Sequence, residues 1–385
     1  MAVEMAMPSP SCRLCGTLLP DEPAFSLENV PRSAQGLPGP TDLAEDSGAD
    51  LLVFQCNACG LVQLAGTPVP YFREVITAAG GSARMVAFRR EQARQFVASF
   101  DLHLRRILEV GCGEGYFLDL LEEAGAEPVG LEASASAVAR GRTLGRTIHQ
   151  GYLEERTRLV GGPFEAFASI NFLEHAPDPV GLLRGLCENL VLGAPGLVEV
   201  PSFEHILECE RFYDFIPDHL SYFTESTLRQ LLERSGFDVI SCSRVWDGYD
   251  LAALVHRRRP MDAQTWDQAR GQLVAELKAF CRTHGKNGRG LAVWGASHQA
   301  LTLLALADAT AVRYVVDSAP FKQGRFTPVV HSPIRGPEAL VEDPVDAVIV
   351  MAAGYSGEVV RILREERAFR GTVAVLRGNA LEVVP

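Results

Sequence analysis

The residues from 109 to 115 combine an acid with closely spaced glycines. The segment reads Glu109-Val110-Gly111-Cys112-Gly113-Glu114-Gly115, and it follows a short apolar run and precedes a stretch with helical periodicity. A glycine lets the backbone approach a ligand closely, because no Cβ stands in the way. A strand, a glycine-rich turn and a helix in this order predict a ligand site at the carboxyl edge of a parallel sheet.

The spacing of these glycines distinguishes between cofactors. A dinucleotide fingerprint needs a third glycine three residues after the second, and Tyr116 occupies that position. The pattern instead resembles that of the class I S-adenosylmethionine-dependent methyltransferases. In that family the acid, here Glu109, helps to hold the methionine end of the donor, and an acid that ends the next strand accepts hydrogen bonds from the ribose hydroxyls. The resemblance therefore assigns donor binding to Glu109, Gly111, Gly113, Gly115, Glu132, Tyr152, Asn171 and Phe172.

Two Cys-x-x-Cys pairs, Cys12 with Cys15 and Cys56 with Cys59, lie in the first part of the chain. Two thiolates on each of two tight turns can close a tetrahedral shell around Zn²⁺. Four thiolates leave no open coordination position, so we predict a structural role for the zinc. The alternative is a redox motif, which we disfavour because both pairs lie outside any βαβ unit.

A cysteine module, a methyltransferase loop and a second α/β region form an unusual order. This order resembles that of the three-domain sugar C-methyltransferase family, which methylates nucleotide-linked 4-keto-deoxysugars in natural-product and polysaccharide pathways. The resemblance covers nearly the whole chain and implies a small-molecule acceptor of that kind. Besides the cysteines and the glycine loop, it rests on Leu173-Glu174-His175-Ala176-Pro177-Asp178-Pro179, on Asp218-His219-Leu220-Ser221-Tyr222-Phe223-Thr224, on Trp294-Gly295-Ala296-Ser297 and on residues 317–328.

The segment from Asp218 to Tyr222 has the composition of a catalytic site. It places an acid, an imidazole (His219) and a phenol within five residues, just beyond an apolar run at 196–200 that predicts a strand, and His175 lies just past another such run at 167–170. Methylation of a carbon beside a ketone requires removal of a carbon-bound proton and stabilisation of the enolate. These side chains suit that chemistry. The alternatives are that Asp218 and His219 cap a helix beginning near Thr224 and that Tyr222 packs in the core.

The chain departs from the sugar C-methyltransferase family at two positions. The family carries a tyrosine two residues before the acid of the acid–histidine pair, where this chain has Ile216, and Tyr213 is the nearest phenol. The C-terminal glycine loop of the family carries a lysine where this chain has Gln299, with His298 beside it. Because of these departures, two alternatives to a nucleotide-sugar acceptor stay open. The acceptor is then a different carbon acid, or a molecule that is methylated on oxygen or nitrogen.

The C-terminal region contains a second strand–loop–helix junction, at residues 295–300. Backbone N–H groups at such a junction can bind an anion, and Asp317 ends the following strand where a ribose-binding acid would lie. The glycines do not fit a dinucleotide site, so a nicotinamide-dependent oxidoreductase is disfavoured. We expect the C-terminal region to recognise the substrate or to serve as a scaffold between domains. Lys322 and Arg325 are available to bind an anionic group of the substrate.

Alternating apolar runs and helical stretches must position these residues. In the middle region we predict strands at 107–110, 128–131, 167–170 and 196–200 and helices at 82–100, 116–124 and 180–190. In the C-terminal region we predict helices at 264–283 and 299–307 and strands at 291–294, 312–316, 347–351 and 372–376. Such alternation predicts mostly parallel sheets with helices on both faces. The fold class is therefore α/β, with a zinc-binding module at residues 1–70, a Rossmann-like class I methyltransferase core at 71–257 and a second Rossmann-like domain at 258–385.

The overall composition excludes several classes of protein. The 385 residues are 47% hydrophobic and carry a formal net charge of −12, which favours a globular protein and disfavours a nucleic-acid partner such as the substrate of an RNA-modifying methyltransferase. The most apolar stretch, 291–316, is interrupted by polar residues, which argues against a membrane span. No secretory signal precedes the cysteines, so we expect a cytoplasmic enzyme with a metal site and free thiols.

Overall fold

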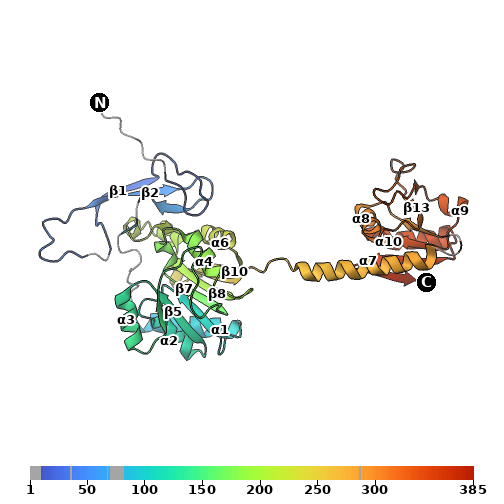
Figure 1. Ribbon diagram of the computed structural model, residues 1–385. Helices are drawn as coiled ribbons and strands as arrows, with labels where there is room; N and C mark the ends of the chain where they lie inside the picture. The colour runs from blue at the N-terminus through green and yellow to red at the C-terminus, as the bar shows by residue number, and fades with distance from the viewer. Residues whose placement is uncertain (1–9, 35–36, 67, 70–81, 286–287, 289) are drawn as a thin grey trace. The chain divides into compact units, whose positions relative to one another are not determined.

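The computed structural model describes residues 10–34, 37–66, 68–69, 82–285, 288 and 290–385 (Figure 1). It divides into two compact units, Met1–Arg259 and Pro260–Pro385. The predicted boundary near Tyr71 lies outside the described residues.

The centre of the first unit is a seven-stranded sheet with the order β10-β11-β8-β7-β4-β5-β6. The parallel strands are β4 (Arg106–Val110), β5 (Glu127–Glu132), β6 (Ile148–Gln150), β7 (Ala166–Ile170) and β8 (Pro195–Pro201). The predicted α/β fold is thereby confirmed. The sheet continues through an antiparallel pair that the sequence analysis did not anticipate, β10 (Phe237–Val245) and β11 (Asp250–Arg257).

Helices cover both faces of this sheet. Ile107 and Leu108 are neighbours on β4 but belong to separate hydrophobic cores, because successive strand residues point to opposite faces. The core around Ile107 contains side chains of α1 (Ala83–Ser99) and α2 (Tyr116–Glu123). The core around Leu108 contains those of α4 (Pro179–Cys187) and α6 (Glu225–Arg234). The remaining helices of this unit are α3 (Ala135–Thr143) and α5 (Phe203–Glu208).

A second, antiparallel sheet lies in the N-terminal part of the same unit. Its order is β1-β2-β3-β9, formed by β1 (Phe25–Val30), β2 (Ala49–Gln55), β3 (Val62–Leu64) and β9 (Ser221–Tyr222). Strand β9 belongs to the segment from Asp218 to Tyr222, for which the sequence predicts a catalytic role. The cysteine-rich region and the methyltransferase core are therefore joined by a shared sheet.

The second unit is a six-stranded sheet with the order β14-β13-β12-β15-β16-β17. Its strands are β12 (Leu291–Trp294), β13 (Val312–Val316), β14 (Ile334–Arg335), β15 (Ala347–Val350), β16 (Thr372–Arg377) and β17 (Ala380–Val384), and only β17 runs antiparallel to its neighbour. Its helices are α7 (Ala263–Gly285), α8 (His298–Ala307), α9 (Ala339–Glu342) and α10 (Ser356–Arg361).

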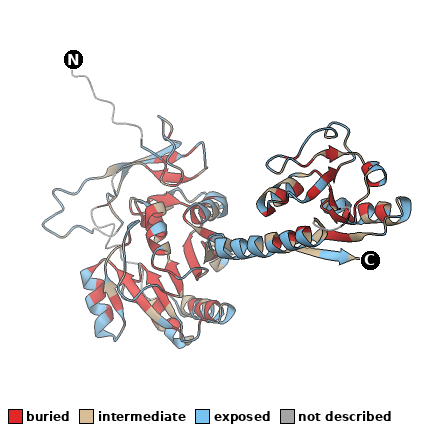
Figure 2. Ribbon diagram, turned by 45° about the vertical axis from the view of Figure 1, so that its right-hand side comes forward, coloured by how far each residue is buried: buried red, intermediate tan, exposed pale blue. Residues whose placement is uncertain are grey.

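Burial follows the layers of each unit. The central strands of both large sheets are buried, whereas most of α7 is exposed (Figure 2). Among the described residues no helix is both long enough and apolar enough to cross a membrane.

Candidate active site and metal centre

The predicted donor loop leaves β4 at the carboxyl edge of the large sheet, and its three glycines all have positive φ angles. A Cβ on Gly111 (φ +75°) would lie 2.3 Å from the Phe172 ring. At Gly113 (φ +56°) a Cβ would meet no heavy atom within 4 Å in the described part of the chain. Gly115 (φ +94°) precedes α2 as its N-cap. The backbone at Gly113 therefore borders open space of the kind a ligand needs.

Two carboxyl groups, of Glu109 and Glu132, lie behind this loop. Glu132 ends β5, and its oxygens accept hydrogen bonds from the backbone N–H groups of Gly113 (2.9 Å) and Ser134 (2.8 Å). Glu109 is also buried, and its Oε2 atom has no hydrogen-bond partner among the described residues. Burial, reinforced by the nearby charge of Glu132, raises the pKa of Glu109 to about 8. A cation placed beside Glu109 would offset that cost.

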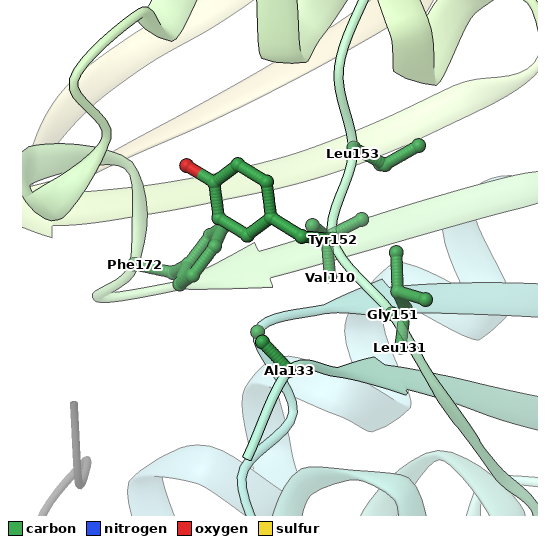
Figure 3. A pocket seen from close by; sticks show the side chains of 8 residues that line it. Val110, Leu131, Ala133, Gly151, Tyr152, Leu153 and Phe172 are labelled. Atoms are coloured by element: carbon green, nitrogen blue, oxygen red, sulfur yellow. The ribbon is translucent and has the colours of Figure 1, made fainter. Parts of the chain in front are cut away.

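A small pocket opens beside the loop (Figure 3). The rings of Tyr152 and Phe172 meet edge to face, with centroids 6.3 Å apart. Asn171 has a positive φ of 48°, and its buried Oδ1 atom has no hydrogen-bond partner within the part of the chain that is described. The flat aromatic walls of the pocket suit a planar heterocycle. The lining residues are Val110, Gly111, Leu131, Ala133, Gly151, Tyr152, Leu153 and Phe172.

The buried ionisable side chains in the described part of the first unit are mostly acids. Arg89, on α1, is the one buried Lys or Arg side chain among the described residues. It forms ion pairs with Glu199 on β8 and, at 3.7 Å, with Asp250 on β11. The other buried acids in that set are Glu109, Glu132, Glu174 and Asp218. Such an interior favours a positively charged ligand over an anionic one.

The four cysteines come together, although Cys15 and Cys56 are far apart in the sequence. The Sγ atoms of Cys12 and Cys59 are 3.5 Å apart, as are those of Cys15 and Cys56, and all four lie within 4.8 Å of one another. A tetrahedron built from Zn–S bonds of about 2.3 Å has edges of about 3.8 Å. The donor set therefore fits zinc.

The two cysteine turns have the same backbone geometry. Gly16 donates its N–H to the carbonyl of Cys12, and Gly60 donates to that of Cys56, both over 2.9 Å. Both glycines have positive φ angles, +77° and +81°. A glycine at this position of each turn avoids the steric cost that another residue would carry.

A second group of polar side chains gathers where β7 ends. His175 is fixed by a 2.8 Å hydrogen bond from its Nδ1 to the backbone carbonyl of Asp218. Its ring lies against that of His219, with centroids 4.8 Å apart, and its Nε2 is 3.7 Å from Oε1 of Glu174. Ligand atoms of Glu174, His175 and His219 all lie within 4.8 Å of one another. These three groups converge on one point near the carboxyl edge of the sheet, next to the strand that carries the donor loop.

Burial sets the protonation of this cluster. It lowers the pKa of His219 to about 3, with the proximity of His175 as a second cause, and it also lowers the pKa of His175. It raises the pKa of Glu174 to about 8. At neutral pH the cluster therefore holds two neutral imidazoles and a protonated carboxyl group. The sequence analysis did not include Glu174 among the candidate site residues. The one feature of the sequence that points to it is its position directly before His175.

Asp218 and Tyr222 are held by the backbone around them. Oδ2 of Asp218 accepts a hydrogen bond from the N–H of Ala34, over 2.7 Å. The Tyr222 hydroxyl accepts a 2.9 Å bond from the N–H of Ile216 and donates to its carbonyl over 3.3 Å. Burial raises the pKa of Tyr222 well above its ordinary value. These bonds occupy the phenol of Tyr222, whereas no partner for the His219 ring nitrogens is found among the described residues.

Tyr213, the phenol nearest to Ile216 in the sequence, lies apart from this cluster. Its side chain is 62% exposed, and its ring contacts Phe212 and the guanidinium of Arg211. The geometry thus brings His175, His219 and Glu174 together and leaves Tyr213 on the surface.

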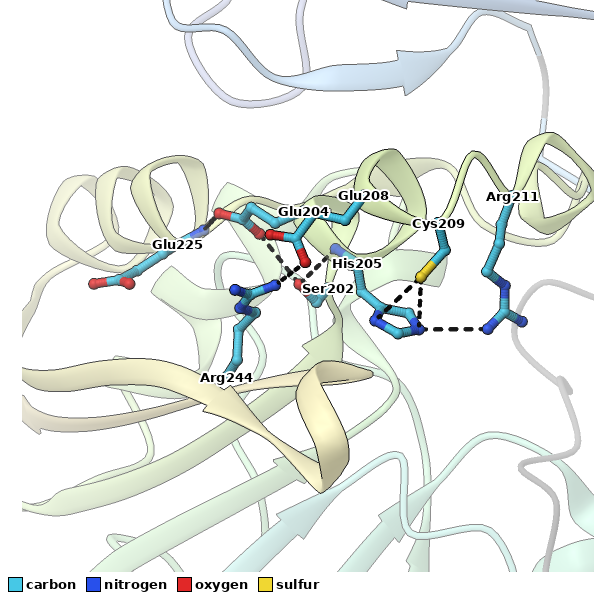
Figure 4. Close-up of polar contacts among 8 residues, drawn as sticks. All are labelled: Ser202, Glu204, His205, Glu208, Cys209, Arg211, Glu225 and Arg244. Atoms are coloured by element: carbon cyan, nitrogen blue, oxygen red, sulfur yellow. Dashed lines mark hydrogen bonds and ion pairs between the residues drawn. The ribbon is translucent and has the colours of Figure 1, made fainter.

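The region after β8 holds the C-terminal end of the segment from Asp218 to Thr224 in place (Figure 4). Glu204, on α5, accepts hydrogen bonds from the Ser202 hydroxyl and from the backbone N–H of Glu225 at the start of α6. Arg244, on β10, pairs with Glu208 over 2.6 Å. Because α6 begins directly after Thr224, these contacts anchor the point where the segment from Asp218 to Thr224 ends.

In the second unit, side chains that follow β13 already bind the backbone of the predicted anion-binding loop at residues 295–300. Asp317 accepts hydrogen bonds from the backbone N–H groups of Ala296 (2.8 Å) and Ala319 (2.9 Å). Its carboxylate also pairs with Lys322, whose Nζ lies 2.9 Å from Oδ2. Lys322 is thereby engaged within this unit, while Arg325 is exposed.

The sequence and the fold together define the class of protein, an S-adenosylmethionine-dependent methyltransferase. Residues 85–242 match the methyltransferase domain family, and residues 261–376 match the C-methyltransferase C-terminal domain family. The chain is therefore an S-adenosylmethionine-dependent methyltransferase whose C-terminal part matches the C-methyltransferase C-terminal domain.

Several known methyltransferases are similar to this chain. The chain is 25% identical to the C-methyltransferase NovU of Streptomyces niveus, with 93% of each chain covered. It is 28% identical to a probable S-adenosylmethionine-dependent methyltransferase of Mycolicibacterium smegmatis, over 46% of this chain and 71% of that protein. A solved methyltransferase from Clostridium acetobutylicum aligns over 44% of this chain and 92% of its own, with 10% identity and a TM-score of 0.37.

Proposed function

We propose that this enzyme methylates an enolisable carbon of a small-molecule acceptor, and that the acceptor is a nucleotide-linked keto-deoxysugar of natural-product or polysaccharide biosynthesis. The observation that carries the proposal is the convergence of Glu174, His175 and His219 beside the donor loop. The C-methyltransferase C-terminal domain and the likeness to NovU support carbon as the methylated atom.

The donor site fits S-adenosylmethionine by its charge and shape. The buried Glu109 Oε2 lacks a partner among the described residues and suits the ammonium group, while Tyr152 and Phe172 suit the adenine. When bound, the donor supplies an electrophilic methyl group, and its C–S bond breaks with the electron pair going to sulfur as the new C–C bond forms. The excess of buried acids favours a sulfonium cation at this place.

In the acceptor site, His219 is the group we assign to proton removal. Burial keeps its ring neutral at pH 7 and so leaves a nitrogen lone pair for the carbon-bound proton. Burial alone disfavours the imidazolium, and the negative charge of the enolate beside the ring raises the pKa of His219 as the proton is transferred. The imidazolium that forms lies in a buried site, where its charge stabilises the enolate more strongly than it would in water. His175 must carry its proton on Nδ1, because the Asp218 carbonyl can only accept, and this leaves Nε2 facing Glu174.

The four thiols supply the second part of the proposal. They form a closed donor set with the spacing of a tetrahedral zinc site, and we assign the zinc a structural role. No chemical step of the transfer requires it.

An acceptor screen tests the proposed reaction. Keto nucleotide sugars and other enolisable compounds are incubated with donor, S-adenosylhomocysteine release is measured, and the product is examined by NMR for a new C–CH₃ group. In deuterated buffer without donor, the acceptor carbon should exchange its proton with wild-type protein and not with His219→Ala. A methyl group on oxygen or nitrogen would instead establish the alternative reaction.

A further inference from the structure

The backbone of Leu220, the residue that follows His219, is held from two sides. The N–H of Leu220 donates a 2.8 Å hydrogen bond to the carbonyl of Glu174, in the methyltransferase core. The carbonyl of Leu220 accepts from the N–H of Leu64, on β3 of the N-terminal sheet, over 3.1 Å. The orientation of the His219 backbone is therefore set jointly by the core and by the cysteine-rich part of the chain.

Arg13 adds a side-chain connection on the N-terminal side. Its Nη1 donates to the carbonyls of Leu64 (2.5 Å) and Leu220 (3.5 Å), and Nη2 donates to the carbonyl of Gly66 (3.5 Å). Its backbone N–H donates to Oε1 of the fully buried Gln63 over 3.0 Å. Several donors in one rigid plane let a guanidinium fix the positions of several carbonyls at once.

The place of Arg13 in the sequence connects it to the metal centre. It lies between Cys12 and Cys15, so the position of its Cα depends on the geometry of the first cysteine turn. Two of its acceptors, Gln63 and Leu64, lie on β3. The β3 residues Val62 and Gln63 pair with Tyr222 and Ser221 of β9. A continuous set of hydrogen bonds thus runs from the cysteine turn through β3 to the segment that carries His219.

We propose that Arg13 is a positioning residue that couples the geometry of the cysteine turn to the placement of His219. It touches neither donor nor acceptor, and it acts through β3 and the carbonyl of Leu220. The inference rests on the proposed function only in taking His219 to face the acceptor. Under this proposal the first cysteine turn affects the rate of the reaction as well as the stability of the fold.

A neighbouring arginine offers a matched control. Arg234, on α6, donates from Nη2 to the carbonyl of Cys15 over 3.4 Å and has no recorded hydrogen bond to β3 or β9 within the described residues. Arg234→Gln therefore removes a guanidinium contact with the same cysteine turn without touching the connection to His219. A difference between the two variants reports on that connection.

The test compares Arg13→Gln, Arg13→Lys and Arg234→Gln in the full chain. Five quantities are measured: zinc content by atomic spectroscopy, the Kd of S-adenosylhomocysteine by calorimetry, kcat and KM with the best acceptor, and amide hydrogen exchange of a peptide covering residues 218–223. For Arg13→Gln we expect unchanged zinc and donor affinity, faster exchange in that peptide, and kcat lowered by about 10- to 100-fold, because small misplacements of a reacting group are costly. Arg13→Lys should recover part of kcat, and Arg234→Gln should match wild type.

Three outcomes would overturn the proposal. These are a wild-type kcat for Arg13→Gln, an equal loss of kcat in Arg234→Gln, or a loss of zinc or donor binding that accounts for the fall in kcat. If Arg13→Gln does not fold, Arg13→Lys decides, since it keeps the charge but cannot reproduce the planar set of donors. His219→Ala, assayed in parallel, separates the two ideas: a wild-type rate there would refute the role of His219 itself, whatever Arg13 does.

Discussion

The ring of His175 and the backbone carbonyl of Asp218 are joined by a 2.8 Å hydrogen bond between residues 43 positions apart. The bond connects the loop after β7, which carries Glu174 and His175, to the segment that carries His219. Because a carbonyl only accepts, the bond also fixes the tautomer of His175. The acceptor site that we propose therefore depends on the contact between these two segments.

Replacing His219 tests its part in the reaction. We expect His219→Ala to lower kcat by about 10²- to 10⁴-fold, the usual contribution of a proton-transferring side chain. The Kd of S-adenosylhomocysteine should stay unchanged. His103→Ala serves as the control, since His103 is exposed and precedes β4 at the opposite edge of the sheet. A near-wild-type rate for His219→Ala would remove this residue from the mechanism.

Gly113 tests the donor loop. A valine Cβ there would enter the open space beside the loop, so Gly113→Val should weaken S-adenosylhomocysteine binding by at least about tenfold. Gly145→Val provides a matched control, because Gly145 also has a positive φ (+86°) and open space, but lies in the turn between α3 and β6. Equal donor affinity in the two variants, measured by calorimetry, would contradict the assignment.

Donor binding should depend on pH through Glu109. Its pKa of about 8 means that the carboxyl group is protonated in the free protein at neutral pH, and an ammonium group beside it favours the charged form. Donor affinity should therefore rise between pH 6 and 8, by up to about tenfold per pH unit, with release of a proton. Glu109→Gln should bind more weakly at pH 8 and show no such rise. Calorimetry in two buffers of different ionisation enthalpy measures the proton released, and a rise retained in Glu109→Gln would assign it to another group.

Loss of a metal ligand should affect both zinc and stability. We expect about one equivalent of zinc in the purified protein, its loss in Cys56→Ser, and a free energy of unfolding lowered by several kcal/mol, since binding energy of a structural metal contributes to folding. Cys209→Ser, which replaces an exposed free cysteine, should keep its zinc and its stability. Metal-free protein with full activity and stability would reject the site.

Arg89 balances two buried carboxylates, Glu199 and Asp250. Arg89→Met should lower the free energy of unfolding by about 3–5 kcal/mol, because it leaves buried charge without a partner. The triple variant Arg89→Met, Glu199→Gln, Asp250→Asn should recover much of that loss. Arg84→Met disrupts a pair whose side chains are both 68% exposed, and it should change little. Urea unfolding measures all three, and no recovery in the triple variant would mean that Arg89 acts through packing.

Local patterns in the sequence predicted most of the regular structure. The strands at 291–294 and 312–316 coincide with β12 and β13, and the helix at 116–124 differs from α2 by one residue. Alternation of buried strands and amphipathic helices is a local property, so it can be identified without tertiary information. The N-terminal strands and the β10–β11 pair were not predicted, since strands such as β2 and β10 mix buried and exposed residues and form no continuous apolar run.

By itself the sequence determined the donor class, through the acid and glycine spacing from Glu109 to Gly115, and the cysteine quartet, because both signals lie in short segments whose chemistry is encoded by residue type and spacing. The tertiary structure alone decided how the acceptor site is assembled. It paired the segment after His219 with the strand that follows the second cysteine turn. It also buried Glu174 beside His175 and occupied the Tyr222 hydroxyl with the backbone of Ile216. These relationships depend on burial and on pairing between distant segments, which no local pattern encodes.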